Sequence, residues 1–324
     1  MSQVHRVTLD HLAVLELKGG QPDQLLQGQV TCDLRLLKED QALPGLLCNL
    51  KGRVVTSFEL LRLASDHLLL VLPADNLPAL TDHLKKFLPF FRCTLQEVTE
   101  QWQLLGLSGK EAPALISSLI TPWPEGKYGA SISETGIALR LPATLPRALV
   151  LLKREQSEHS NLLQRLNSLT EATPASCWQM LDIQAGRVEV TAQLTDSYLP
   201  QMLNLQAVGA ISFKKGCYIG QEIVARAQYR GQVKKRLYRV HLPCSELNEL
   251  PANVLDSDNK VVGDIILSAP DRRSETEALA VLSITAVEEA TPLFVQVDGQ
   301  SVKLNLLQLP YDAQGRLNAP FETT

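Results

Sequence analysis

The apolar residues of this chain are gathered in many short runs of strand length, and this pattern limits the folds open to it. Residues 68–72 (Leu-Leu-Leu-Val-Leu) are one such run. No run approaches the roughly 20 apolar residues that a membrane-spanning helix needs. Because 45% of the 324 residues are hydrophobic, there is enough apolar material for ordinary buried cores. We therefore expect a globular protein of two or three domains with no part in a membrane.

Strand-like and helix-like segments alternate over the first two thirds of the chain. Residues 7–17 alternate as a single strand does, and residues 23–30 begin like a helix, with Pro22 and Asp23 at its entrance. Further strands are expected at 54–63, 68–72, 93–98, 102–107, 136–141 and 148–152, and helices at 75–87, 111–120 and 155–169. Strands followed by a helix, repeated, favour split α+β units with antiparallel sheets over a parallel doubly wound fold.

The pattern changes after Gly231, where short strand candidates follow one another closely. They are residues 237–242, 253–256, 261–267, 279–284, 293–297 and 302–306. The sequence Val-Asp-Gly-Gln at 297–300 is a strong tight-turn signal between two of them. Several short strands with close turns predict a small β-barrel or sandwich. We place the boundary near residue 235, which divides the chain into regions 1–235 and 236–324.

A lone cysteine, Cys217, lies in the segment Lys-Lys-Gly-Cys-Tyr-Ile-Gly-Gln-Glu at residues 214–222. Gly216 and Gly220 on either side let the backbone turn sharply and approach a ligand closely. Residues 221–229 then have the pattern of a short amphipathic helix. The positive end of that helix and the two lysines favour the thiolate form of the cysteine. Two interpretations stay open: a reactive thiolate, or the small buried residue that most free cysteines are.

The six cysteines and six histidines of the chain are scattered, with no C-x-x-C pair. This spacing argues against a disulfide framework and against a classical zinc site. A protein that held its own iron–sulfur cluster would normally show clustered cysteines, so we expect no permanently bound metal. Phosphate-loop, dinucleotide, zinc-protease and serine-hydrolase motifs are missing as well.

Positive charge is concentrated beside the cysteine segment. The whole chain has a net charge of −4, yet residues 214–239 hold eight basic side chains and one acid, Glu222. Arg226, on the expected helix, and Arg230, directly after it, are the candidate anion-binding residues. Such an excess favours an anionic partner such as polyglutamate, phosphate or RNA, although a solvated surface would show the same composition.

Residues 199–222 (LPQMLNLQAVGAISFKKGCYIGQE) closely resemble the signature of the YgfZ family. That family comprises folate-binding proteins related to the T-protein, the aminomethyltransferase of the glycine cleavage system. Matching blocks at 26–31 (LQGQVT) and 309–311 (LPY) extend the resemblance over nearly the whole chain. It implies two interleaved T-protein-like α+β subdomains within 1–235, the inner one at about 51–100 and beyond, followed by a C-terminal β-barrel.

The resemblance also implies a site for tetrahydrofolate or a derivative. Trp178 corresponds to a tryptophan associated with folate in the family, and Leu12 stands where some relatives have a second tryptophan. Gln184 replaces the glutamate with which T-proteins grip the pterin, and an amide there still donates and accepts hydrogen bonds. Three further amide side chains are candidates either for pterin contacts or for bracing loops: Gln27, Asn204 and Gln206.

By the same resemblance, Cys217 would act as a reactive thiol. The residues expected to shape its site are Lys215, Gly216, Tyr218, Gly220, Gln221 and Glu222. The aspartate pair that T-proteins use for methylene transfer is missing from residues 51–56, so we do not expect a classical aminomethyltransferase.

The function implied is support of iron–sulfur cluster assembly or repair, and thereby of tRNA modification such as methylthiolation. Iron–sulfur enzymes or assembly factors would be transient partners. The alternatives are a folate-dependent one-carbon transferase acting on tRNA or a protein, and a direct tRNA-binding module that uses residues 214–239. The N-terminus shows no basic-then-apolar signal layout, so we expect a cytoplasmic protein.

Overall fold

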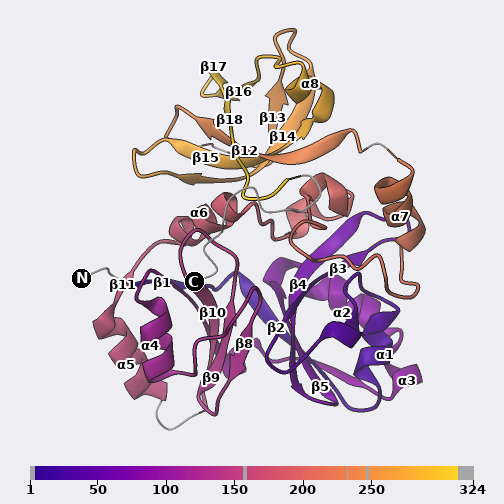
Figure 1. Cartoon of the computed structure of the whole chain (residues 1–324), viewed down its shortest axis with the longest axis vertical. Coiled ribbons are helices and arrows are strands. Elements are labelled where there is room, and N and C mark those ends of the chain that lie inside the picture. Colours follow the sequence, from indigo (N-terminus) through magenta and orange to yellow (C-terminus); the bar gives the residue numbers. More distant parts are fainter. Residues whose placement is uncertain (1–3, 156–158, 232, 246, 248, 313–324) are drawn as a thin grey trace.

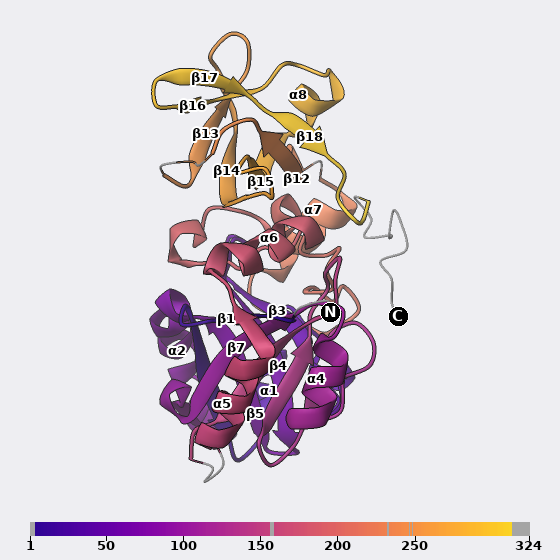
Figure 2. The same ribbon diagram turned by 90° about the vertical axis from the view of Figure 1, so that its left-hand side faces the viewer.

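The computed structural model describes residues 4–155, 159–231, 233–245, 247 and 249–312 (Figure 1). Three sheets organise it, and all their strand pairs are antiparallel except one between β1 and β11. Two sheets form the lower part of the molecule in Figures 1 and 2, and the third forms the upper part, with helix α6 between them. The α+β class, the antiparallel sheets and the separate β-rich C-terminal part are confirmed.

The five-stranded sheet has the order β3-β4-β5-β2-β6. Its strands are β2 (Leu12–Lys18), β3 (Leu43–Cys48), β4 (Val54–Ala64), β5 (His67–Pro73) and β6 (Thr94–Glu97). The short helices α1 (Pro22–Gln27), η1 (Leu34–Leu36), η2 (Ala74–Asn76), α2 (Leu77–Lys85) and α3 (Leu88–Phe91) belong to the same region. Leucines of β2, β4 and β5 form a buried core with α1 and α2.

The six-stranded sheet has the order β11-β1-β7-β10-β9-β8. Its strands are β1 (Val4–Thr8), β7 (Trp102–Ser108), β8 (Ala130–Ile132), β9 (Gly136–Arg140), β10 (Arg147–Lys153) and β11 (Thr170–Ala172). Helices α4 (Ala112–Leu119) and α5 (His159–Leu169) pack on it, and η3 (Thr99–Gln101) precedes β7. The five-stranded sheet is therefore an insertion between β1 and β7.

The single strand expected at residues 7–17 is wrong. The chain turns at Leu9, whose carbonyl accepts a hydrogen bond from the amide of Leu12 at 3.2 Å. β1 then pairs with β7, whereas β2 pairs with β5 and β6 in the other sheet. The apolar alternation runs through the turn because both strands bury side chains in the core between the two sheets. The turn brings Leu9 and Leu12 to the junction of the sheets.

The segment after the second sheet crosses the molecule before the C-terminal part begins. It contains α6 (Ala175–Ala185), η4 (Ala192–Leu194), η5 (Pro200–Leu203) and α7 (Gln221–Tyr229). The third sheet has the order β17-β16-β13-β14-β15-β12-β18 and curls into a half-barrel. It consists of β12 (Lys235–Leu242), β13 (Ala252–Leu255), β14 (Val261–Pro270), β15 (Thr276–Ser283), β16 (Phe294–Val297), β17 (Gln300–Lys303) and β18 (Asn305–Leu307), with helix α8 (Ile284–Glu288). None of the described helices is long and apolar enough to cross a membrane.

Candidate functional site

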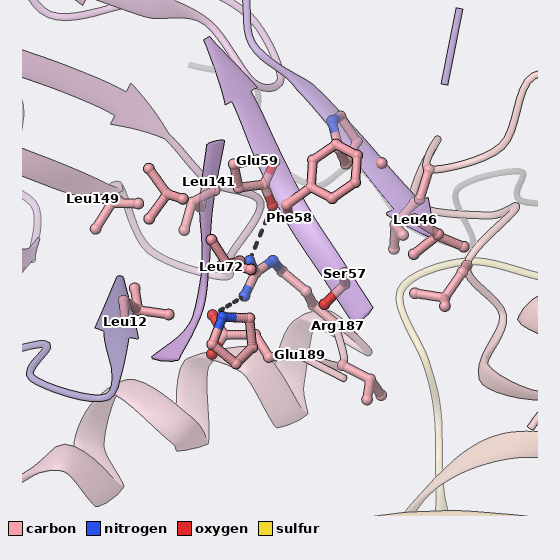
Figure 3. Close-up of a pocket in the computed structure, with 18 of the residues that line it drawn as sticks. Leu12, Leu46, Ser57, Phe58, Glu59, Leu72, Leu141, Leu149, Arg187 and Glu189 are labelled. Carbon is pink, nitrogen blue, oxygen red and sulfur yellow. Dashed lines mark hydrogen bonds and ion pairs between the residues drawn. The ribbon is translucent and has the colours of Figure 1, made fainter. Parts of the chain in front are cut away.

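A pocket lies where the two lower sheets meet the segment that follows α6 (Figure 3). Strand β4 contributes both a charged and an apolar side chain to this region, because Glu59 and Leu61 lie on the face of that strand directed toward the six-stranded sheet. The lining is largely apolar and comes from segments far apart in the first 210 residues: Leu9, Leu12, Pro44, Gly45, Leu46, Ser57, Phe58, Glu59, Val71, Leu72, Pro73, Tyr128, Leu141, Leu149, Trp178, Arg187, Val188, Glu189, Leu205, Val208 and Ala210. A mostly apolar pocket with a few convergent polar groups is typical of small-molecule sites.

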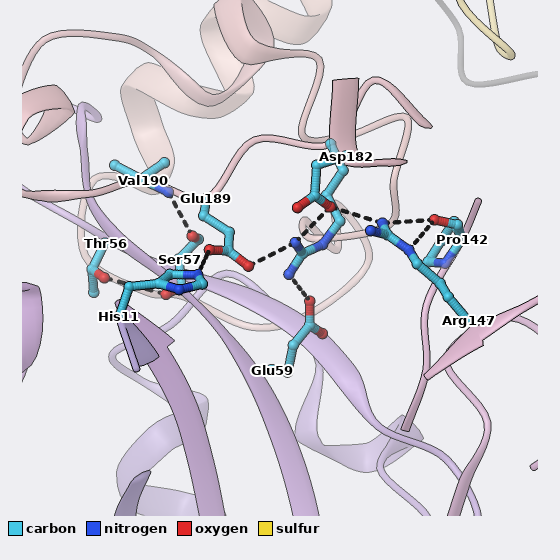
Figure 4. Close-up of polar contacts among 10 residues, drawn as sticks. His11, Thr56, Ser57, Glu59, Pro142, Arg147, Asp182, Glu189 and Val190 are labelled. Atoms are coloured by element: carbon cyan, nitrogen blue, oxygen red, sulfur yellow. Dashed lines mark hydrogen bonds and ion pairs between the residues drawn. The ribbon is translucent and has the colours of Figure 1, made fainter. Parts of the chain in front are cut away.

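The guanidinium group of Arg187 is the centre of a buried charged network in this pocket (Figures 3 and 4). It lies 3.0 Å from the carboxylate of Glu59, 3.1 Å from that of Asp182 and 2.9 Å from that of Glu189. Three carboxylates thus share one arginine, although the four residues come from β4, α6 and the segment after it. Buried charges of this kind persist only when paired.

Arg147 and His11 extend the network at its two ends (Figure 4). Arg147, which has no exposed surface, contacts Asp182 at 2.7 Å and donates two hydrogen bonds to the carbonyl of Pro142. His11, in the turn between β1 and β2, lies 3.2 Å from Glu189. The network therefore joins both lower sheets to α6.

Burial and pairing oppose each other in this network. Burial raises the pKa of Glu59 above its ordinary value in spite of Arg187. Burial acts the same way on Glu189, but Arg187 and His11 outweigh it and lower that pKa. The hydrogen bond to Glu189 in turn raises the pKa of His11. The pKa values of Glu59 and Glu189, which share Arg187, are thus shifted in opposite directions. Such shifts are common at functional sites.

Three polar atoms around the pocket are buried and have no hydrogen-bond partner among the described residues. They are Oε2 of Glu59, the hydroxyl oxygen of Tyr128 and Nε1 of Trp178. A buried polar atom left unpaired costs about 1–3 kcal/mol, so native proteins keep few of them. Their convergence on one pocket indicates that a polar ligand completes their hydrogen bonding.

The pocket is narrow in this conformation. Its free space is about 30 Å³, on a scale where one water needs at least about 10–15 Å³. The ring of Phe58 fills the space beside Gly45, where a Cβ atom would lie 2.5 Å from it. Gly45 therefore lets the aromatic ring occupy part of the pocket, and moving that ring is the direct way to enlarge it.

Two of the expected folate residues, Leu12 and Trp178, line the pocket. Trp178 is 2% exposed, packs against the backbone of β7 at Gly106 and has the guanidinium of Arg147 at 4.7 Å from its ring centroid. Gln184 lies outside the lining and accepts a hydrogen bond from the hydroxyl of Thr144 at 2.9 Å.

The other three amide candidates also lie outside the pocket lining. Gln27 holds the turn after α1, donating to Asp33 at 3.0 Å and accepting from the amide of Leu34 at 2.8 Å. Asn204 adopts a left-handed conformation after η5 and donates to the carbonyl of Leu237. Gln206 follows it between two pocket residues, Leu205 and Val208. The contacts of Gln27 and Asn204 brace loops.

Cys217 is exposed, in the loop that precedes α7. Gly220 caps that helix in a left-handed conformation, with φ of 80°. Gln221 accepts a hydrogen bond from the amide of Tyr218, whose side chain is buried. Glu222 and Arg226 form an exposed ion pair one helical turn apart. The loop thus presents its thiol to solvent while its neighbours fix the backbone.

Lys215 does not belong to the exposed basic surface. It is 6% exposed, and its ammonium donates to the carbonyl oxygens of Val30 at 2.6 Å and Cys32 at 2.7 Å. Burial lowers its pKa to about 8. The lysine therefore ties the cysteine loop to the chain at Val30 and Cys32, at the end of the block that begins at residue 26. Gly216, next to it, and Arg230, at the end of α7, are exposed.

Sequence reasoning did not single out Glu59, Tyr128, Arg187 and Glu189 as site residues. The available signal was a charged residue inside an apolar strand or beside a buried helix, as in Ser-Phe-Glu-Leu-Leu at 57–61. Such a residue usually has a buried partner. A single sequence does not show which residue that partner is.

A second group of titratable side chains lies in the C-terminal sheet. His241, Asp271 and Glu275 have potential ligand atoms within 4.8 Å of one another. His241 and Glu275 already contact each other at 2.8 Å, and one oxygen of Asp271 accepts from the amides of Arg273 and Glu275. These contacts account for the arrangement as an ordinary turn with an ion pair.

The chain has the fold of the glycine cleavage T-proteins. The chain superposes on the aminomethyltransferase T of the glycine cleavage system from Bartonella henselae with a TM-score of 0.76, covering 98% of this chain and 88% of that one at 17% identity. The model of the GCVT N-terminal domain family matches residues 2–131.

Curated relatives narrow this class to one family. The tRNA-modifying protein YgfZ of Colwellia psychrerythraea (strain 34H) is 34% identical over 239 residues, which are 74% of this chain and 72% of that protein. The protein of the same name from Escherichia coli O17:K52:H18 (strain UMN026) is 32% identical over 243 residues, 75% of this chain and 73% of that protein. The chain belongs to the YgfZ family.

Proposed function

We propose that this protein binds a reduced folate in the central pocket and supports tRNA modification through Cys217. The observation that carries the folate part is the set of unpaired buried atoms on Glu59, Tyr128 and Trp178. The pterin edge of a folate presents adjacent amino, ring-nitrogen and carbonyl groups. Such an edge matches a carboxylate acceptor, a hydroxyl and an indole donor. Membership of a family of tRNA-modifying proteins with a T-protein fold supports the rest.

Binding would require the pocket to widen. The pterin is larger than the present free space of about 30 Å³, so its entry must displace side chains. Phe58 is the residue best placed for this, because a change of its side-chain rotamer would vacate the space beside Gly45. The ligand would then supply the apolar contacts that the ring gives up.

Cys217 would act at the surface, on an iron–sulfur cluster under assembly or repair or on the enzyme that carries it. Arg226 on α7 and Arg230 directly after it are both exposed and would meet an anionic partner, either tRNA or an acidic face of such an enzyme. The chain would supply the exposed thiol of Cys217 for the chemistry and the two arginines for binding the partner. The cluster would be cargo, not a resident cofactor.

The folate part is tested by calorimetric titration with tetrahydrofolate under anaerobic conditions. The wild type should show saturable binding. Glu59→Gln keeps the shape of the side chain but removes its charge, and should weaken binding at least about tenfold, as expected for a charge-assisted hydrogen bond. Glu222→Gln removes an exposed carboxylate and serves as the control. If the Glu59→Gln variant bound tetrahydrofolate as tightly as the wild type, the folate would not bind beside Glu59 and this assignment of the pocket would be wrong.

The tRNA part is tested in a strain that lacks the gene. Cys217→Ala should fail to restore methylthiolated nucleosides in tRNA, measured by mass spectrometry. Cys177→Ala, which removes the other exposed cysteine, should restore them. Full restoration by Cys217→Ala would end the assignment of a reactive thiol.

A further inference from the structure

A second, much larger cavity opens on the six-stranded sheet. It is a groove with about 820 Å³ of free space, lined by Lys110, Pro113, Trp123, Glu125, Gly126, Lys127 and residues 140–146. Pro113, Pro142, Ala143, Leu145 and Pro146 make its apolar part.

The rim of the groove is positively charged. Lys110, Lys127 and Arg140 line it, with Glu125 as the one acid among the lining residues. Among the described residues, none of the three cations forms an ion pair. The guanidinium of Arg140 lies 5.7 Å from the ring centroid of Trp123. Three cations without carboxylate partners in one groove favour an anionic ligand.

The groove adjoins the central pocket. Leu141 lines both cavities. The ammonium of Lys127, in the groove, lies 5.6 Å from the ring centroid of Tyr128, whose hydroxyl is one of the unpaired atoms of the pocket. Glu59 is near enough to raise the pKa of Lys127 against the larger effect of burial, which lowers it. A ligand in the central pocket would thus have the ammonium group of Lys127 nearby, on the side where the pocket meets the groove.

The loop between the two cavities is held in place by the buried network. The carbonyl of Pro142 accepts from Arg147, and Thr144 donates to Gln184 on α6. Arg147 is in turn paired with Asp182 of the pocket network. The wall of the groove and the charged centre of the pocket are therefore connected by hydrogen bonds and an ion pair.

We propose that this groove binds the γ-linked oligoglutamate tail of a folate whose pterin lies in the central pocket, so that the protein selects polyglutamylated folates. The inference rests on the proposed folate site. Each added glutamate brings one carboxylate, and the three cations of the groove supply the complementary charge. The apolar floor accommodates the methylene groups between the carboxylates.

Single-stranded RNA is the other anion to consider for a basic groove. RNA-binding grooves use exposed aromatic faces on which bases stack. Here Trp123 already has Arg140 over its ring. Contact with the pocket through Leu141 also has no counterpart in an RNA site, whereas a tail continuous with a bound pterin requires it. These two features favour the oligoglutamate.

The test compares two ligands that differ in the tail alone, tetrahydrofolate with one glutamate and with five. Calorimetry gives the dissociation constant of the monoglutamate divided by that of the pentaglutamate for the wild type and for Lys110→Gln/Arg140→Gln. The control is Lys260→Gln/Lys303→Gln, which removes two exposed cations from the C-terminal region. The wild type should bind the pentaglutamate about tenfold more tightly, equivalent to about 1.4 kcal/mol. This preference should fall with salt and should be lost in the groove variant but not in the control.

The outcomes separate the inference from the proposed function. Equal affinity of the wild type for both ligands overturns the inference and leaves the folate site intact. A preference that survives in the groove variant places the tail elsewhere and overturns it too. Absence of binding by either ligand overturns both proposals. If Arg140→Gln perturbs β9, the single change Lys110→Glu, at an exposed side chain, should still lower the preference for the pentaglutamate. An unchanged preference would again count against the groove.

Discussion

The carboxylate of Glu59 lies 3.0 Å from the guanidinium of Arg187, 128 positions later in the chain. Glu59 belongs to the five-stranded sheet, whereas Arg187 follows the helix that lies above both lower sheets. Both side chains are buried, and the second oxygen of Glu59 stays unpaired. The pair therefore both joins distant parts of the chain and presents a free acceptor to the pocket.

Replacing Arg187 by methionine should destabilise the protein by about 3–5 kcal/mol, because buried carboxylates lose their common cation. Arg226→Met provides the matched control: it breaks an exposed ion pair one turn apart on α7 and should cost at most about 0.5 kcal/mol. Urea unfolding at neutral pH measures both. A loss below about 1 kcal/mol for Arg187→Met would show that the network does not support the fold.

The fold class could be predicted from the sequence because its signals are local. Strand-length apolar runs and close turns identify antiparallel sheets wherever the chain places them. The one strand predicted at residues 7–17 failed for the same reason, since apolar alternation continues through the turn at Leu9 into a different sheet. Local periodicity does not record which sheet a strand joins.

The pocket could be predicted in part. Trp178 and Leu12 were identified through resemblance, and both line the pocket. The charged network was not identified, because an acid in an apolar strand indicates a buried partner without naming it. Arg187 lies three positions after Gln184, yet it lines the pocket while Gln184 holds the loop at Thr144. Sequence proximity at the end of a helix therefore does not show which of two side chains enters a pocket.

The cysteines should differ sharply in reactivity. Cys217 and Cys177 are exposed, whereas Cys32 and Cys48 are buried and burial raises the pKa of each to about 12. Since the thiolate is the nucleophile, brief treatment with iodoacetamide at neutral pH should modify the first two and spare the others. Peptide mass spectrometry gives the extent at each site, with denatured protein as the reference for complete labelling. Modification of Cys32 at the rate of Cys217 in the folded protein would contradict the structure.

Lys215 should make stability depend on pH between about 8 and the ordinary lysine value of 10.5. Its pKa is lower in the folded protein than in the unfolded chain, so the unfolded chain binds more protons in this range. Stability contributed by this group therefore rises with pH. Lys215→Met lacks the effect and also leaves two carbonyl oxygens without their donor. The difference in unfolding free energy between wild type and variant should widen from pH 8 to pH 10.5. Other groups titrate alike in both proteins, so a constant difference would argue that the lysine pKa is not lowered.

The two glycines beside Cys217 should respond differently to alanine, although the sequence presents them as equivalent. Gly220 has φ of 80°, and a Cβ atom there would lie 2.4 Å from the carbonyl oxygen of Asn49. Gly216 has no atom within 4 Å of such a Cβ and no positive φ. Gly220→Ala should therefore cost at least about 1–2 kcal/mol from the left-handed backbone alone, and more from the clash. Gly216→Ala should be nearly neutral.

Urea unfolding and the rate of Cys217 alkylation together locate the effect of these two changes. Gly220→Ala has to move the turn at residues 49–52 or the start of α7, and so should alter the alkylation rate as well as stability. Gly216→Ala keeps the thiol on the same backbone path and should leave both nearly unchanged. Equal losses from the two substitutions would mean that the cysteine loop is not fixed by its contact with Asn49. The exposure of the thiol would then have to depend on Lys215, which anchors the loop from the other side.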